Sequence, residues 1–207
     1  MSLTSGVRTA PVLSLRAVSS SRLAPVTLDL FAGEAIAIVG QSGSGKSLLL
    51  RQIADLDPGA GEVSLNGVDR SAMKGFEWRR HVMYCQAEAG WWEDGVAAHF
   101  SESEVAQEMA SRLGISKDIF HAQVMALSTG ERQRLALVRA LSLSPHVLLL
   151  DEPTAALDQD ATMRVEKELE RYLSQGGSMV FVTHNVAQAH RLSQRLFRMT
   201  AGLLESV

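Results

Sequence analysis

The glycine-rich segment Gly40-Gln41-Ser42-Gly43-Ser44-Gly45-Lys46-Ser47 constrains this chain more than any other feature. It follows the apolar run Ala35–Val39 and precedes an expected helix at Lys46–Ala54, the setting in which such loops bind phosphates. Its glycines let successive N–H groups point at phosphate oxygens, and the helix adds the positive end of its dipole. Lys46 is expected to reach the β- and γ-phosphates, and the Ser47 hydroxyl to ligate Mg²⁺. The predicted nucleotide-binding residues are Gly40, Gln41, Ser42, Gly43, Ser44, Gly45, Lys46, Ser47 and Leu48.

A pair of carboxylates forms a second candidate site. The apolar run Val147–Leu150 ends in Asp151 and Glu152, and Pro153 follows them. Open α/β sheets bind ligands at the carboxyl ends of their strands, so these acids are expected near the phosphate loop. Asp151 is predicted to hold the magnesium shell, and Glu152 to polarise an attacking water as a general base. The alternative is a solvated pair at a strand end, since such pairs are common.

The order of apolar runs predicts an α/β fold with an antiparallel sheet near the start and a helical insertion in the middle, at about residues 87–145. Strands are expected at Leu13–Val18, Val26–Leu30, Ala35–Val39, Glu62–Leu65, Val82–Cys85, Val147–Leu150, Met179–Thr183 and Arg195–Met199. Helices are expected at Lys46–Ala54, Glu104–Leu113, Thr129–Ala140, Asp158–Leu173 and Asn185–Leu192.

Composition excludes several classes of protein. The 207 residues suffice for one domain, and 46% of them are hydrophobic, enough for a packed core. A net charge of −3 gives no reason to expect a nucleic-acid partner. The single cysteine, Cys85, rules out an internal disulfide, and no apolar run approaches the roughly 18 residues of a membrane span. We therefore expect a soluble, cytosolic protein.

The N-terminal segment allows two interpretations. Residues 1–28 contain three arginines and no acid, a composition that organellar transit peptides share. Leu13, Leu15 and Ala17 also alternate with polar residues, as in an ordinary strand, and this interpretation is favoured because a second strand follows. Met1–Gly6 is interpreted as a flexible end or a cloning remnant.

The segment Leu127-Ser128-Thr129-Gly130-Glu131 lies between the two nucleotide motifs, the Walker A loop (residues 40–47) and the Walker B segment (residues 148–153). With these motifs, the chain resembles the nucleotide-binding subunits of ABC transporters from Leu13 to Met199. The family signature is usually written LSGGQ. Here Thr129 replaces the first of its two glycines and Glu131 replaces its glutamine, and both are interpreted as acceptable variants. The resemblance implies one ABC ATPase domain over residues 1–207, with a RecA-like P-loop NTPase core.

The resemblance also assigns roles to further residues. Gln86 is similar to the glutamine that contacts Mg²⁺ and senses the membrane subunit, and His184 to the switch histidine that contacts the γ-phosphate. Asp158 is similar to the aspartate of the loop that crosses the dimer interface. The implied catalytic residues are Glu152, His184 and Gln86; the implied metal ligands are Ser47, Gln86 and Asp151; further nucleotide contacts are Ser128, Gly130, Glu131 and Asp158.

The signature is predicted to act on a second copy of the chain. Ser128 and Gly130 start a helix, so the hydroxyl and the backbone N–H groups form an anion site. The resemblance implies that this site caps ATP held by another copy or a homologous subunit, and that hydrolysis separates the two. It further implies ATP and Mg²⁺ as cofactors, a separate transmembrane permease as partner, and a place on the cytoplasmic face of the membrane.

Two other functions compete with transport. A non-transport ABC ATPase of DNA repair, chromosome structure or translation would share the nucleotide site, but such proteins carry coiled coils, zinc modules or a second cassette. A module that binds ATP only as a dimerisation switch is disfavoured by Glu152 and His184.

Two positions remain open. No Tyr, Trp or His precedes the phosphate loop to stack on adenine; Arg22 lies near the expected place, either stacking through its guanidinium or simply solvated. Trp91 and Trp92 are either anchors for the membrane partner, the slightly favoured interpretation, or buried in the helical segment.

Overall fold

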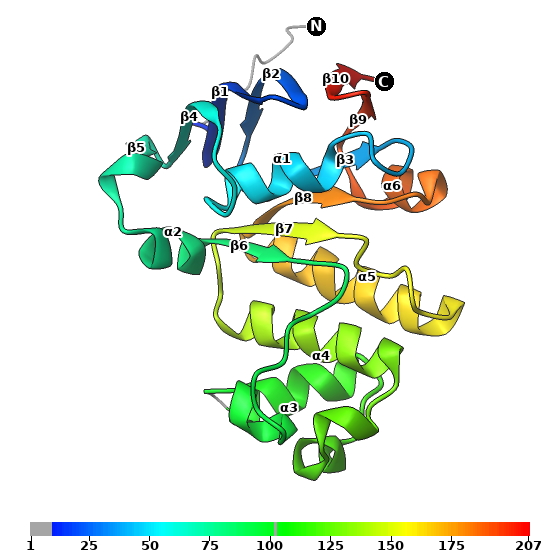
Figure 1. Cartoon of the computed structure of the whole chain (residues 1–207). Helices are drawn as coiled ribbons and strands as arrows, with labels where there is room; N and C mark the ends of the chain where they lie inside the picture. Colours follow the sequence, from blue (N-terminus) through cyan, green and yellow to red (C-terminus); the bar gives the residue numbers. More distant parts are fainter. Residues whose placement is uncertain (1–9, 102) are drawn as a thin grey trace, which may run out of the picture.

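The computed structural model describes residues 10–101 and 103–207 as two sheets with helices around them (Figure 1). The expectation for Met1–Gly6 lies outside these residues. In Figure 1 the smaller sheet lies at the top, the larger sheet crosses the middle, and α3 and α4 form the lower end.

The larger sheet has six strands and holds the candidate site at one edge. Its inner strands are buried at every residue, since both faces of the sheet are covered. The strands pair in parallel except at the outer edge, where β10 runs antiparallel to β9. The spatial order is β10 (Leu203–Ser206), β9 (Arg195–Thr200), β3 (Ala35–Val39), β8 (Ser178–Val182), β7 (Val147–Asp151) and β6 (Val82–Cys85).

The smaller sheet confirms the β-rich beginning of the chain. Its strands pair antiparallel in the order β2 (Leu23–Leu30), β1 (Leu13–Ser20), β4 (Ala60–Leu65) and β5 (Val68–Asp69). The strand interpretation of the N-terminal segment is therefore confirmed from Leu13 onward.

All five predicted helices are present, and α2 is an addition that the sequence did not predict. Residues 87–145 are less helical than expected, because short 3₁₀ turns occupy Val96–His99, Lys117–His121 and Val124–Ala126. Along the described part of the chain, no helix combines the length and apolar character needed to cross a bilayer. The helices are α1 (Lys46–Ile53), α2 (Gly75–His81), α3 (Ser103–Arg112), α4 (Thr129–Ser142), α5 (Gln159–Ser174) and α6 (Val186–Leu192).

Alternate residues of the larger sheet face two separate cores. Ile36, Leu149 and Val180 pack with α1 and the smaller sheet, whereas Leu148 and Phe181 pack with the helices of the other face. This alternation follows from the period of two along a strand. Because β3, β7 and β8 run parallel, the phosphate loop after β3, Asp151 at the end of β7 and His184 after β8 lie at the same edge of the sheet.

Candidate nucleotide-binding site

The phosphate loop joins β3 to α1 and has the shape that its glycines permit. Gly40, Gly43 and Gly45 have φ angles of +154°, +75° and +110°. A Cβ atom at Gly40 would lie 2.3 Å from the carbonyl oxygen of Met199 in β9, so this contact also requires glycine. Gly45 is the N-cap of α1, which directs the first N–H groups of that helix toward the loop.

Lys46 lies inside the loop with 6% of its surface exposed. Its ammonium group donates hydrogen bonds to the carbonyl oxygens of Gly40 and Gln41, both at 2.8 Å. Burial lowers the pKa of Lys46, and the nearby carboxylates of Glu152 and Asp151 oppose this effect. An ammonium group carries three hydrogens, so one remains for a phosphate oxygen.

A cavity of about 370 Å³ brings most of the predicted groups together. It lies where the phosphate loop, the end of β7 and the segment after β8 meet. Gly40, Gln41 and Ser44 line a neighbouring cavity of about 740 Å³, which also contacts Ser42, Gly43 and His184. The residues around the first cavity are Arg22, Ser42, Gly43, Gly45, Lys46, Ser47, Leu48, Ala87, Asp151, Glu152 and His184.

Ser47 and Asp151 supply oxygen donors that suit Mg²⁺. Both line the first cavity, and magnesium is usually held by one or two carboxylates together with phosphate oxygens and water. Within residues 10–101 and 103–207, no group of three or more His, Cys, Asp or Glu side chains could hold a metal ion. One hydroxyl and one carboxylate leave the remaining coordination positions to phosphate oxygens and water, so this donor set fits a cation that arrives with a nucleotide.

Gln86 does not line this cavity. It is exposed after β6 and lines a groove between β6 and α4, while its neighbour Ala87 lines the phosphate cavity. The structure therefore does not bring Gln86 to Ser47 and Asp151, and its metal and catalytic roles stay predictions. Arg22 is exposed and also lines the cavity, which leaves its adenine contact a prediction.

Glu152 and His184 form a pair at the cavity wall. The imidazole Nε2 of His184 lies 3.0 Å from Glu152 Oε1, and the backbone N–H of His184 donates to Oε2 at 3.3 Å. Burial raises the pKa of the Glu152 carboxyl, and His184 opposes the shift. Glu152 also has a φ angle of +50°, so its backbone turns out of the strand direction. A carboxyl with a raised pKa beside a phosphate site suits a general base.

A hydrogen bond to Asp151 was not predicted from the sequence. The Tyr84 hydroxyl donates to Asp151 Oδ2 at 2.9 Å, across the parallel pair β6 and β7. Burial raises the pKa of Tyr84, and the neighbouring Asp151 carboxylate adds to the shift, so the hydroxyl keeps its proton. No local sequence signal indicates this contact, because the two residues are 67 positions apart.

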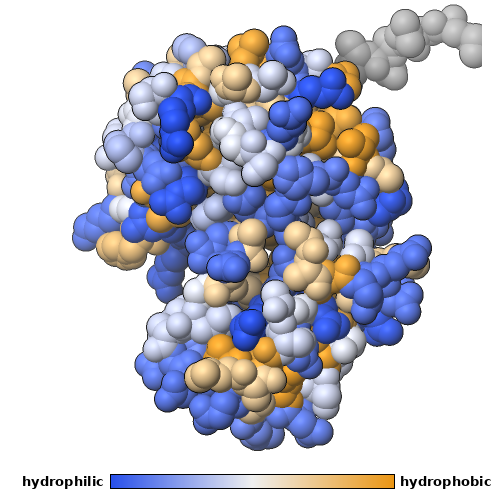
Figure 2. Space-filling model, turned by 45° about the vertical axis from the view of Figure 1, so that its right-hand side comes forward, coloured by the Kyte–Doolittle hydropathy of each residue, from blue (hydrophilic) through white to orange (hydrophobic). Residues whose placement is uncertain are grey.

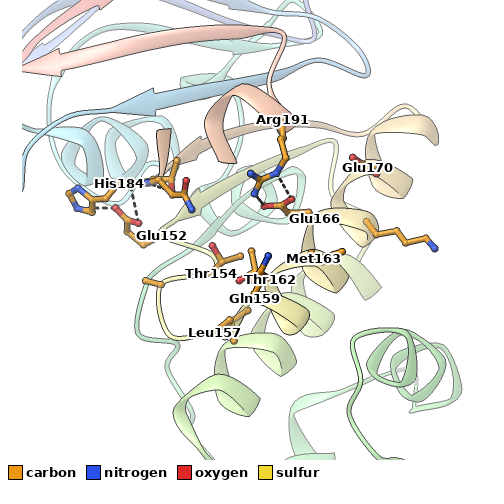
Figure 3. Close-up of a pocket in the computed structure, with 14 residues that line it drawn as sticks. Glu152, Thr154, Leu157, Gln159, Thr162, Met163, Glu166, Glu170, His184 and Arg191 are labelled. Atoms are coloured by element: carbon orange, nitrogen blue, oxygen red, sulfur yellow. Dashed lines mark hydrogen bonds and ion pairs between the residues drawn. The ribbon is translucent and has the colours of Figure 1, made fainter. Parts of the chain in front are cut away.

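A buried polar network includes Thr183, the residue before His184. Gln188 is fully buried and accepts a hydrogen bond from the Thr183 hydroxyl at 2.9 Å. Its amide donates to Thr154 Oγ1 at 2.9 Å and to Glu166 Oε1 at 3.1 Å. Arg191 contacts both oxygens of Glu166, at 3.0 and 2.7 Å. Figure 3 shows Thr154, Glu166 and Arg191 of this network, with Glu152 and His184, around a cavity of about 1030 Å³.

The Gln188→Glu variant is expected to lose about 3 kcal/mol of unfolding free energy at neutral pH. The new carboxylate would face Glu166 without a hydrogen to donate, although Arg191 offsets part of the repulsion. This repulsion raises the pKa of the carboxyl pair, so the loss should shrink as the pH falls and one carboxyl gains a proton.

Thermal unfolding of this variant and the wild type, measured between about pH 8 and pH 5, checks the prediction. The exposed Gln175→Glu change is the matched control, and it should show no such trend. A loss at Gln188 that does not vary with pH would contradict the like-charge explanation.

Gln133 of α4 connects Glu152 to the loop before α5. Its side-chain amide donates to the Glu152 carbonyl oxygen at 2.8 Å, and its amide oxygen accepts from the Ala156 N–H at 3.3 Å. Asp158 ends this loop as the N-cap of α5, accepting from the Ala161 N–H at 2.8 Å. Gln133 was not predicted as a site residue.

The segment Leu127–Glu131, here called the signature corner, lies outside the phosphate cavity of its own chain. None of the cavity residues belongs to the segment Leu127–Glu131. Ser128 is exposed as the N-cap of α4; its N–H and hydroxyl donate to Glu131 Oε2 at 2.8 and 2.7 Å. The Ser128 oxygen in turn accepts from the Glu131 N–H at 3.2 Å. The predicted helix start is therefore confirmed as a capping box, whereas its contact with a phosphate stays a prediction.

The fold and the phosphate loop define a P-loop NTPase domain. A sequence profile described as "ABC transporter" matches residues 23–155. The chain is 35% identical to the sulfate/thiosulfate import ATP-binding protein CysA of Mesorhizobium japonicum, over 88% of this chain and 57% of that protein. It is 34% identical to the putrescine transport ATP-binding protein PotG of Escherichia coli, over 93% of this chain and 55% of that protein. This chain thus belongs to the ABC transporter family and is a nucleotide-binding domain of that family.

Solved structures support the same fold. The ATP-binding subunit of an ABC transporter matches with a TM-score of 0.85 and 21% identity, over 95% of this chain and 90% of that one. A dimeric ATP-binding cassette with bound ADP and Pi matches with a TM-score of 0.81 and 24% identity, over 94% and 98%. The predicted α/β P-loop fold is confirmed. The chain spans little more than half the length of the CysA and PotG proteins above.

Proposed function

We propose that this chain binds and hydrolyses ATP and thereby drives transport through a separate transmembrane permease. One observation carries the proposal: Lys46, Ser47, Asp151, Glu152 and His184 line a single cavity beside the phosphate loop. A structural loop would not need a cation, two acids and an imidazole at one point.

The phosphates are bound by groups of the loop and α1. Backbone N–H groups of the loop and the start of α1 face the anion, and Lys46 supplies a positive charge. Ser47 and Asp151 would hold Mg²⁺, which neutralises charge on the phosphate oxygens when bound.

Glu152 and His184 carry the chemistry. The oxygen of a water molecule attacks the γ-phosphorus, the bond from that phosphorus to the β–γ bridging oxygen breaks, and Glu152 accepts the water proton. His184 Nε2, 3.0 Å from Glu152 Oε1, holds the carboxylate in place. In this proposal the same imidazole turns to the γ-phosphate when the nucleotide is bound. ADP and inorganic phosphate are the products.

The proposal includes a dimer of two copies, and the position of the signature corner supports it. Ser128, Gly130 and Glu131 are at a helix start outside the phosphate cavity of their own chain. A second copy can place this corner over the bound γ-phosphate, where the positive end of α4 stabilises the anion. Hydrolysis removes the phosphate that links both copies.

A groove of about 660 Å³ between β6 and α4 is the proposed permease contact. Leu56, Trp92 and Leu143 line it with 41%, 66% and 48% of their surfaces exposed. Figure 2 shows that the molecule narrows between its larger part and the part that contains the helical segment, with apolar patches on the latter. Exposed apolar side chains in a groove are typical of a protein interface.

Trp91 and Trp92 have different surroundings, and of the two Trp92 lines this groove. Trp91 is half-buried and packs against the core of the helical face, whereas Trp92 is largely exposed. The Arg139 guanidinium lies 4.9 Å from the Trp91 ring centre and 4.7 Å from that of Trp92, which holds both rings. Trp92 is therefore the proposed anchor, and the burial interpretation fits Trp91.

The cargo is expected to be selected by the permease. CysA and PotG, named for sulfate/thiosulfate and putrescine, are 35% and 34% identical to this chain, so similar ATPases serve different substrates. Within this proposal the chain lies on the cytoplasmic face of the membrane, bound to its permease.

Trp92→Glu is expected to prevent co-purification with the proposed permease, because a carboxylate would be placed in the apolar groove. Phe76→Glu is the control: Phe76 is an aromatic side chain that is 57% exposed on α2 and does not line the groove. The yield of the complex after detergent extraction is the measurement. Equal loss in both variants, or none in either, would contradict the docking site.

A further inference from the structure

Tyr84 connects a core strand to the acid predicted to bind magnesium. It lies on β6 with its side chain on the face that packs with α1. Its hydroxyl donates to Asp151 Oδ2 at 2.9 Å. Across residues 10–101 and 103–207, no other side-chain hydrogen bond reaches the Asp151 carboxylate.

The arginine closest to Tyr84 in electrostatic effect, Arg51, is already paired with another carboxylate. Arg51 of α1 binds both oxygens of Asp57, at 2.8 and 2.7 Å. Asp151 is 8% exposed, and its orientation therefore depends on the tyrosine rather than on an arginine. Asp151 lines the phosphate cavity, and because the hydroxyl occupies Oδ2, the other oxygen, Oδ1, keeps its lone pairs for a cation.

We propose that Tyr84 is a positioning residue for the magnesium site: its hydroxyl fixes the Asp151 carboxylate so that Oδ1 faces the cation of the bound nucleotide. This inference rests on the proposed function. Side chains that orient a metal ligand by hydrogen bonds typically change metal affinity by 10- to 100-fold when they are removed. Tyr84 also lines the groove between β6 and α4, so it joins the proposed docking surface to the acidic site.

The test compares the two tyrosines of the chain. Tyr84→Phe removes only the hydroxyl and is expected to raise the Mg²⁺ concentration for half-maximal binding of a fluorescent ATP analogue by about tenfold. Binding of the same analogue in EDTA should stay at the wild-type level. Tyr172→Phe is the matched control, since the Tyr172 hydroxyl donates to backbone oxygens of Pro145 and Ser178 and should leave Mg²⁺ dependence unchanged.

A double-mutant cycle separates orientation from general damage. In the Asp151→Asn background, Tyr84→Phe should have no further effect on the Mg²⁺ titration, and this comparison also holds where Tyr84→Phe is less stable. Wild-type half-saturation in Tyr84→Phe would overturn this inference alone. A wild-type chain whose nucleotide binding ignores Mg²⁺ would overturn the proposed function along with it.

Discussion

The Glu152→Gln variant is expected to bind ATP normally but to release phosphate at least about 100-fold more slowly than the wild-type protein. Glutamine keeps the size of the side chain and can still contact His184, while it cannot accept the proton of the attacking water. The raised pKa of the Glu152 carboxyl gives it the proton affinity that a general base needs. Lys46 and the loop, which hold the phosphates, are not changed.

Phosphate release and gel filtration together check this prediction. With ATP and Mg²⁺ the variant should elute as a dimer, because the γ-phosphate that joins the two copies persists; ADP should leave it monomeric. Glu205→Gln is the control: Glu205 is exposed on β10, away from the phosphate cavity, and this variant should hydrolyse ATP at the wild-type rate. A Glu152→Gln protein that stays monomeric with ATP would contradict the role of the signature corner.

The parts of the site that could be predicted from the sequence are those encoded locally. The phosphate loop follows from glycine spacing between a strand and a helix, and Ser128 as a helix start follows from the Glu131 three residues later. Val147–Leu150 of β7 are all apolar and buried, so Asp151 at the end of this strand was predictable as well. In each case a short segment contains the complete signal.

The remaining contacts depend on distant parts of the chain. Tyr84 meets Asp151, and Gln188 meets Glu166, only because separate elements pack together. The helix α2 has a weak pattern, since Trp78 alone is buried among basic residues, yet its indole N–H donates to the Ile53 carbonyl oxygen at 2.9 Å. Gln86 lines the groove between β6 and α4 rather than the phosphate cavity, which is also a tertiary property that no motif specifies.

The phosphate loop depends on the small size of Gly40 as well as on its backbone angle. A Cβ atom there would lie 2.3 Å from the Met199 carbonyl oxygen and 3.1 Å from Ser44 Oγ. Gly40→Ala must therefore separate the loop from β9, and we expect it to lower the free energy of unfolding by about 2 to 6 kcal/mol, the sum of overpacking and backbone strain. ATP binding should fall with it, because Lys46 donates to the Gly40 carbonyl oxygen.

Gly43→Ala separates the two causes within the same loop. Gly43 also has a positive φ, of +75°, but a Cβ atom there would meet nothing within 4 Å. Only the left-handed backbone cost of about 1 to 2 kcal/mol should remain. Urea unfolding of both variants gives the comparison, and Gly40→Ala should be the less stable by about 2 kcal/mol or more. Equal losses would mean that the backbone angle alone requires glycine, and that the contact with β9 does not fix the loop.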